Sequence, residues 1–332
     1  MEPWTTHCQA RSLSCKHIQS LHSVTHCNEP VDIMANQPKK LHLVGIGVTH
    51  SIAPNMHNHI ARSLDLPWTF HATECPTLDE VIQLARDEKT AGLVVTMPYK
   101  TAIIQRLDEV DDLAKAIGAC NNVYYKDNRL CGTNTDWLGI EGCLLEKSGA
   151  VKSATTTSAL IVGAGGASRA AVYALTSQLS CRQIYVLNRD DAEVEDLKKD
   201  AERLPVIPEI VHVKDVDQAR ECKAVDFVVG TVPDLEPQTP SELQVASMLE
   251  IFLRQETKGV LLDMCFKPRR TRMIKLAEGL GWPCVEGTHV IGYQIERQYS
   301  LWAGETCLTK LDKAGAWKTL LRDAEQSLGI NF

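Results

Sequence analysis

The sequence predicts an α/β protein with two domains. Its 332 residues exceed the size at which a single hydrophobic core usually stops growing. Short apolar runs alternate with helical segments along both halves of the chain, an alternation typical of largely parallel sheets with helices on both faces. Between the halves, residues 148–158 are rich in Gly, Ser and Thr, which predicts a linker.

The regular pattern of the first half begins at Leu41, and residues 39–147 are expected to form one domain. The run Leu41-His-Leu-Val-Gly-Ile-Gly predicts a buried strand that ends in glycines. Pro54 follows near the start of a helix, where proline is favoured. A hairpin is predicted around Lys126-Asp-Asn. The further expected elements are strands at 69–74, 91–96, 122–125 and 130–132 and helices at 54–66, 78–87, 100–107 and 111–117.

The pattern restarts after the linker, and residues 148–290 are expected to form the second domain. Its expected strands lie at 159–162, 183–187, 225–229 and 259–263. One expected helix follows the glycine-rich turn and ends at residue 179, and another covers 273–280. From about residue 291 the chain is helical to its end.

Residues 1–38 lack hydrophobic periodicity and are predicted to be a disordered tail. The tail contains three His/Cys pairs, His7 and Cys8, Cys15 and His17, and His26 and Cys27. Their spacing matches no zinc finger or ribbon, so we expect no metal site. A translation start at Met34 is an alternative reading, and Arg11 and Lys16 make a weak case for a transit peptide.

Composition argues against several functional classes. No apolar run reaches the roughly 18 residues that span a bilayer, so we expect no membrane segment. A net charge of -7 argues against nucleic acid as the main partner. The 12 cysteines form no CxxC pair and follow no secretory leader, so we expect reduced thiols in a soluble cytoplasmic protein.

A glycine-rich turn follows the first strand of the second domain. Gly163 permits a tight turn, Gly165 lets the backbone approach a pyrophosphate, and Gly166 opens the helix whose positive end would bind it. In this strand–turn–helix context the motif predicts a Rossmann dinucleotide-binding domain. Ala167 and Thr231 complete the contacts expected around the turn.

The end of the next strand is where adenosine-ribose selectivity is usually set. Asn188 and Arg189 come first, and Arg189 could pair with the 2′-phosphate of NADP. Asp190, Asp191 and Glu193 add negative charge that would repel this phosphate and suit the free ribose of NAD. The acids could instead simply begin the next helix. We favour NAD, with NADP as the alternative.

In the first domain a set of polar residues repeatedly ends strands and begins helices. The set is Ser51, Lys100, Asn121, Asn122 and Asp136. Alone, each is more often a solvated helix start or an N-cap. Together they offer hydrogen bonds for a polyol and a proton acceptor for alcohol oxidation.

Several motifs occur in a fixed order along the chain. They are His50-Ser51-Ile52-Ala53-Pro54 with His57-Asn58, Val95-Thr96-Met97-Pro98-Tyr99-Lys100, Gly118-Ala119-Cys120-Asn121, Asn134-Thr135-Asp136-Trp137-Leu138-Gly139, the glycine turn with the later Asn188-Arg189, Asp263-Met264, and Gln294. From about Leu41 to its end, the chain resembles the shikimate/quinate dehydrogenase family on these motifs.

The resemblance implies a cleft between an N-terminal substrate-binding domain and the Rossmann domain. Lys100 and Asp136 would be the proton-transfer pair, and the final helices, 291–332, would return to the first domain. The residues implied to hold ring hydroxyls and the carboxylate are Ser51, Thr96, Asn121, Asp136 and Gln294. The implied reaction is the reversible oxidation of quinate to 3-dehydroquinate or shikimate to 3-dehydroshikimate with NAD or NADP, and a homodimer is possible.

Two positions depart from the family pattern. Ala53 replaces the second serine of the first motif, and Phe266 replaces a tyrosine after Asp-Met. Each lost hydrogen bond is worth on the order of 1 kcal/mol, or more against a charge. The carboxylate must then be held differently, with Lys267, Arg269 and Arg270 as candidates. Room beside Ala53 would suit the extra hydroxyl of quinate, which we favour.

Three alternatives remain open from the sequence. The first is an enzyme of this family that acts on another cyclic hydroxy acid. The second is a non-catalytic sensor of such metabolites. A sensor would be free to lose Lys100 and Asp136, whereas this sequence keeps both. The third is a structural Rossmann protein in which the polar set is coincidental.

Overall fold

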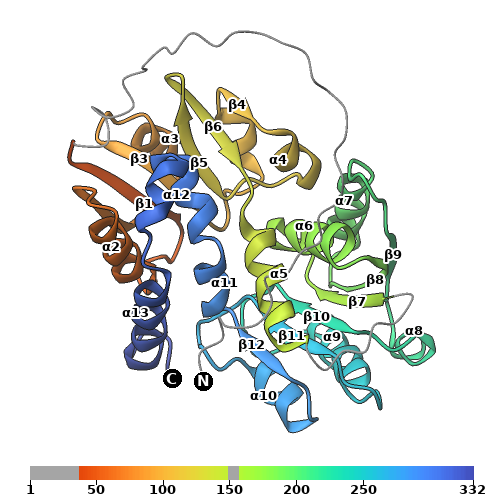
Figure 1. Ribbon diagram of the computed structural model, residues 1–332. Helices are drawn as coiled ribbons and strands as arrows, with labels where there is room; N and C mark the ends of the chain where they lie inside the picture. The colour runs from red at the N-terminus through yellow and green to blue at the C-terminus, as the bar shows by residue number, and fades with distance from the viewer. Residues whose placement is uncertain (1–36, 149–156) are drawn as a thin grey trace, which may run out of the picture.

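The structure is a computed structural model that describes residues 37–148 and 157–332 (Figure 1). The three His/Cys pairs and Met34 of the predicted tail lie outside the described residues, as does most of the predicted linker. No helix of the described ranges is long and apolar enough to cross a membrane.

The first sheet has six strands in the order β2-β1-β3-β5-β6-β4. All neighbouring strands are parallel except β5, which runs antiparallel to both β3 and β6. The strands are β1 (Lys39–Gly45), β2 (Trp68–Glu74), β3 (Thr90–Val95), β4 (Glu109–Val110), β5 (Asn122–Lys126) and β6 (Arg129–Thr133). The predicted hairpin is confirmed, and its turn residues Asp127 and Asn128 take the positive φ values of 50° and 60° that tight hairpin turns require.

Each face of the first sheet packs against its own layer of helices, and the two interfaces form two separate apolar cores. The elements in these layers are α2 (Ala53–Ser63), α3 (Leu78–Ala85), η1 (Ala102–Arg106), α4 (Asp112–Ile117), α12 (Ile295–Ala303), η4 (Glu305–Lys310) and α13 (Lys313–Gln326). Helices α12 and α13, from the end of the chain, share the core of one face with α2. Figure 1 shows α13 beside α2.

The second sheet is parallel throughout, in the order β12-β11-β10-β7-β8-β9. Its strands are β7 (Thr157–Val162), β8 (Cys181–Leu187), β9 (Glu209–His212), β10 (Phe227–Gly230), β11 (Val260–Asp263) and β12 (Cys284–Glu286). Counted from β7, this is the 3-2-1-4-5-6 order of dinucleotide-binding folds. The predicted fold class is therefore confirmed for both halves.

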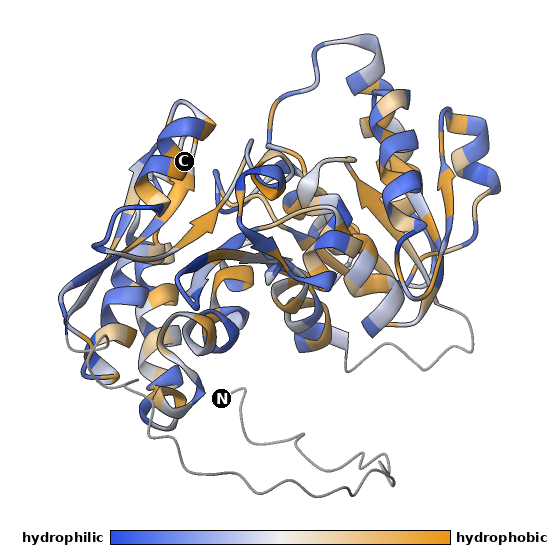
Figure 2. Ribbon diagram, turned by 90° about the horizontal axis from the view of Figure 1, so that it is seen from above, coloured by the Kyte–Doolittle hydropathy of each residue, from blue (hydrophilic) through white to orange (hydrophobic). Residues whose placement is uncertain are grey.

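Helices cover both faces of the second sheet, and apolar residues gather on the strands and on the inner sides of the helices (Figure 2). The covering elements are α6 (Gly166–Tyr173), η3 (Ala174–Gln178), α7 (Asp191–Ala201), α8 (Val216–Glu221), α9 (Pro240–Leu253) and α10 (Arg272–Gly279). Helices α5 (Asp136–Lys147) and α11 (Thr288–Tyr293) pack on each other, and α5 also contacts α6 and β11. Thus α5, which begins at Asp136, carries the chain from one sheet to the other.

Several elements differ from the sequence prediction. The helix expected at 100–107 is a short 3-10 helix, Ala102–Arg106. Strands β4, β9 and β12 were not predicted, because they are short and, unlike the fully buried four-residue strands β10 and β11, are not continuous apolar runs. Helix α9 was also missed, although Thr239, Pro240 and Glu242 form a capping box with proline in the first turn.

Candidate active site

Lys100 and Asp136 meet in the structure although 36 positions separate them. Lys100 lies in the loop after β3, and Asp136 is the first residue of α5. The Lys100 ammonium donates to Asp136 Oδ2 at 2.6 Å, and the side chains are only 15% and 6% exposed. A nearly dry ion pair of this kind can position a proton donor or acceptor next to a bound hydroxyl.

Asn121 and Gln294 join this pair through one hydrogen-bond network. Asn121 Nδ2 donates to Asp136 Oδ1 at 2.8 Å and to Gln294 Oε1 at 2.9 Å. Thr135 completes the network, since its backbone N–H donates to Asn121 Oδ1 at 2.6 Å and its hydroxyl to Gln294 Oε1 at 2.6 Å. Thr135 is fully buried and was not singled out from the sequence, although it precedes Asp136 in the Asn-Thr-Asp motif. The network fixes the orientation of the Asp136 carboxylate.

Ser51 and Thr96 lie at the same edge of the first sheet but outside this network. Thr96 directly follows β3, and its backbone N–H donates to Val44 O at 2.9 Å. Ser51 lies in the loop after β1, where its hydroxyl accepts from Ala53 N at 3.2 Å. Both side chains are half-buried, and neither hydroxyl bonds to Lys100 or Asp136.

The two departures from the family pattern lie near each other in space. Ala53 is buried at the start of α2, and the Phe266 ring lies 5.7 Å from the ring of His50 in the loop before it. Of the three candidate cations, Arg269 and Arg270 both pair with Glu286, at 2.9 and 3.0 Å. The exposed ammonium of Lys267 has no ion pair within residues 37–148 and 157–332. Burial and the charge of Lys267 lower the pKa of His50.

Asp263 holds the loop that carries Phe266. It lies at the end of β11, where Oδ1 accepts from Cys265 N at 3.1 Å and Oδ2 from the Thr271 hydroxyl at 2.7 Å. Its carboxylate therefore ties together the two ends of the loop. Burial raises the pKa of Asp263 to about 6.

The glycine turn fits a dinucleotide pyrophosphate. Gly163 has φ +112°, and a Cβ there would lie 2.5 Å from Thr231 Oγ1, so only glycine is accommodated. No atom lies within 4 Å of a Cβ built on Gly165, which leaves open space beside the N-terminus of α6. Thr231 Oγ1 donates to Val162 O at 2.8 Å and so holds the turn against β7.

The glycine turn also lies against the Lys100 loop. A Cβ built on Gly166 would lie 3.3 Å from Lys100 Cβ and 3.8 Å from Ala119 Cβ. The ion pair of the first sheet and the dinucleotide turn of the second therefore border the same space.

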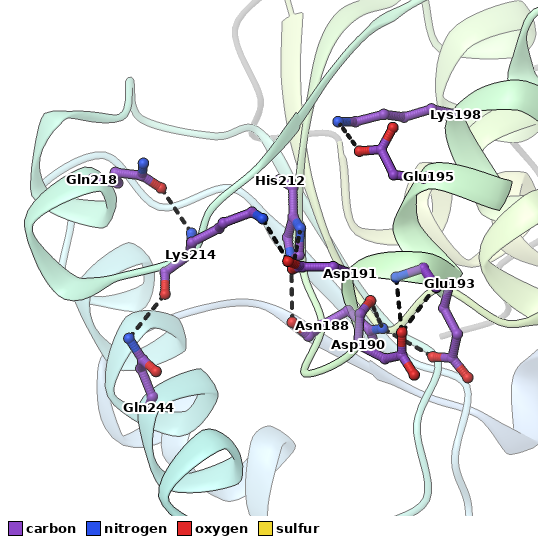
Figure 3. Close-up of polar contacts among 11 residues, drawn as sticks. Asn188, Asp190, Asp191, Glu193, Glu195, Lys198, His212, Lys214, Gln218 and Gln244 are labelled. Carbon is purple, nitrogen blue, oxygen red and sulfur yellow. Dashed lines mark hydrogen bonds and ion pairs between the residues drawn. The ribbon is translucent and has the colours of Figure 1, made fainter.

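The end of β8 is rich in charged side chains (Figure 3). Asp190 caps α7 by accepting from Ala192 N at 2.8 Å, so the alternative reading that these acids begin the next helix is confirmed for Asp190. Asn188 Nδ2 donates to Glu193 Oε2 at 2.9 Å, and Lys214 pairs with Asp191 at 2.7 Å. Arg189 pairs with Glu242, at the start of α9, at 2.5 Å.

No group of three or more His, Cys, Asp or Glu residues within the described ranges could hold a metal ion.

Two family descriptions match the chain, one for each sheet. Residues 43–123 match the Shikimate dehydrogenase substrate binding domain, and residues 159–280 match the Saccharopine dehydrogenase NADP binding domain.

Similar proteins match along most of the chain. The quinate dehydrogenase of Emericella nidulans is 32% identical over 306 residues, which cover 85% of this chain and 93% of that protein. The pentafunctional AROM polypeptide of Eremothecium gossypii is 35% identical over 275 residues, 81% of this chain but only 17% of that polypeptide. The structure of shikimate 5-dehydrogenase from Thermus thermophilus, in complex with NADP(H) and shikimate, is 26% identical with a TM-score of 0.66, and the match covers 86% of this chain and 99% of that one.

Proposed function

The chain belongs to the shikimate/quinate dehydrogenase family, and on this premise we propose that it oxidises quinate or shikimate, or reduces the corresponding ketone, with a nicotinamide cofactor. Residues 39–147 and 291–332 would bind the ring acid, and residues 148–290 would bind the cofactor. One observation carries the proposal: the Lys100–Asp136 pair borders the glycine turn, with Gly166 against Lys100.

Lys100 and Asp136 would move the proton. As the C–H bond of the carbinol carbon breaks and its electron pair leaves as hydride, the O–H bond also breaks and a C=O bond forms. The hydroxyl proton passes to the Lys100–Asp136 pair, which is within reach of a hydroxyl bound beside Lys100 Nζ. When bound, the nicotinamide supplies the hydride acceptor.

Asn121, Thr135 and Gln294 would support this step by orientation. Asn121 fixes Asp136 Oδ1, while Oδ2 is directed at the Lys100 ammonium. The low exposure of the pair, 15% and 6%, keeps competing water away from the proton path. Ser51 and Thr96, at the same edge of the sheet, would bind polar groups of the ring acid.

We favour quinate as the substrate. Ala53 leaves more room than a serine for the hydroxyl that quinate carries on its quaternary carbon. The substrate carboxylate needs a cation to replace the missing hydroxyls of Ala53 and Phe266. Lys267 is the best candidate, because Glu286 already pairs with Arg269 and Arg270.

We favour NAD as the cofactor. Three acids, Asp190, Asp191 and Glu193, surround the end of β8, where the ribose 2′ position is read in dinucleotide-binding folds. A ribose diol can donate hydrogen bonds to carboxylates, whereas a 2′-phosphate would be repelled by them.

We also propose that the protein works in the reducing cytoplasm. No disulfide joins two cysteines of the described residues, which is typical of a reducing compartment. Fluorescence microscopy of a tagged chain would test this location, and import into an organelle would contradict it.

The test is a four-way assay. Purified protein is mixed with quinate or shikimate, each with NAD or NADP, and reduced nicotinamide is followed by absorbance. We expect the fastest reduction with quinate and NAD. No reduction in any mixture, with cofactor binding shown separately, would overturn both substrates and favour another cyclic hydroxy acid.

A further inference from the structure

The cofactor preference depends on what Arg189 is free to bind. Arg189 lies two residues after the end of β8, the second strand of the dinucleotide-binding order, where an arginine can accommodate the 2′-phosphate of NADP. Its guanidinium instead pairs with Glu242 Oε1 at 2.5 Å, across 53 positions of sequence. The arginine that would bind a 2′-phosphate is therefore already engaged by a carboxylate.

Glu242 is held in place independently of Arg189. It is the third residue of α9 and closes the capping box with Thr239. Its second oxygen, Oε2, accepts from Gln238 N and Thr239 N, both at 3.0 Å. These backbone donors lower the pKa of Glu242 to about 2, so the carboxylate stays charged at any physiological pH. The negative charge remains fixed even when the exposed Arg189 side chain moves.

A second cation at this edge, Lys214, is also engaged. The Lys214 ammonium pairs with Asp191 Oδ2 at 2.7 Å, as Figure 3 shows. Gln244, two residues after Glu242, donates to Lys214 O at 2.9 Å and holds this loop beside α9. A 2′-phosphate would have to displace a carboxylate from either cation, whereas a ribose hydroxyl needs neither.

We infer that Glu242 is a specificity-determining residue that excludes NADP by holding Arg189 in an ion pair. This inference rests on the proposed nicotinamide-dependent function and deepens it. The start of α9 lies outside the glycine turn motif, and it would then set the cofactor preference through Arg189.

Glu242→Gln tests the inference with little structural change. Glutamine also fits the capping box, so α9 keeps its first turn while Arg189 loses its charged partner. We expect the Kd for NADP, and for the probe adenosine 2′,5′-bisphosphate, to fall about tenfold, in line with the strength of charge-assisted hydrogen bonds. The Kd for NAD should change less than about threefold.

Two further variants and a control make the test specific. Adding Arg189→Ala to Glu242→Gln should abolish the gain in NADP affinity. Arg189→Ala alone should leave the NADP affinity nearly unchanged, because this arginine is engaged in the wild type. The control Glu250→Gln removes the ion pair of Glu250 with Arg254 further along α9 and should change neither Kd.

The outcomes separate this inference from the proposed function. An unchanged Kd for NADP in Glu242→Gln, or a gain that survives Arg189→Ala, would overturn the role of Glu242. A wild type that already binds NADP more tightly than NAD would overturn it as well. NAD binding without turnover of any ring acid would overturn the proposed reaction, while the binding measurements would still decide on Glu242.

Discussion

Replacement of Lys100 by methionine is the most direct test of the proposed chemistry. The change removes the ammonium and keeps most of the length of the side chain. It leaves the Asp136 carboxylate, only 6% exposed, without its cation. Both the rate and the stability should therefore fall, for different reasons.

The expected sizes of the two effects follow from the site. A positioned proton donor or acceptor contributes about 10²- to 10⁴-fold in rate, equivalent to about 3–5 kcal/mol in the barrier. Removing one partner of a buried ion pair costs about 3–5 kcal/mol of folding free energy. Asp136 still accepts from Asn121 Nδ2 at 2.8 Å, so we expect a stability loss near the lower end, about 3 kcal/mol.

The double variant Lys100→Met/Asp136→Asn separates catalysis from stability. Asparagine can still accept from Asn121 but carries no charge, so much of the lost stability should return while kcat stays low. The assay combines steady-state kinetics, cofactor binding and chemical denaturation. Lys115→Met is the matched control. Lys115 lies on α4 and forms an exposed ion pair with Asp112 at 3.5 Å, so its loss should change neither the rate nor the stability much.

One result would refute this reasoning. If Lys100→Met keeps kcat within about tenfold of the wild type, Lys100 does not belong to the proton path, since even weak general acid–base catalysis is worth about 10². If the double variant regains both stability and rate, the ion pair has a structural role alone. Cofactor binding should stay nearly unchanged in both variants.

Three further predictions address the rest of the site. Ala53→Ser should lower the KM for shikimate about fivefold by restoring one hydrogen bond of about 1 kcal/mol, and an unchanged KM in steady-state kinetics would remove Ala53 from the account of specificity. Gln294→Leu should leave buried donors of Asn121 and Thr135 unpaired and lower the unfolding free energy by about 2–4 kcal/mol in urea titrations, and a loss below about 1 kcal/mol would contradict the network. The folded-state pKa of Asp263, about 6, lies above its ordinary 3.8, so its contribution to stability is fully present below about pH 4 and is lost as the pH rises through about 6, by an amount on the order of 3 kcal/mol. Urea titrations from pH 4 to 7 should show that Asp263→Asn lacks this part of the pH dependence, and parallel curves for variant and wild type would show that Asp263 is not the group responsible.

The sequence by itself determined the two α/β halves, the dinucleotide turn and the polar residues at the strand ends. These features are local. A buried strand, a glycine turn and a helix occupy about 20 contiguous residues, and the need for glycine at Gly163 follows from its positive φ within that turn. Lys100, Asn121 and Asp136 could be singled out because each lies within a few residues of a readable strand.

Only the tertiary structure decided which side chains meet. Asn121 bonds to Gln294 across 173 positions, and Arg189 pairs with Glu242 across 53. From the sequence, Arg189 could be read as a phosphate ligand and Lys267 as one of three equivalent cations. Their different partners depend on how α9 and β12 pack beside other elements, and no local pattern encodes that packing. An ion pair forms only where two charged groups lie within a few ångströms of each other, whereas sequence periodicity reports only which face of an element is buried.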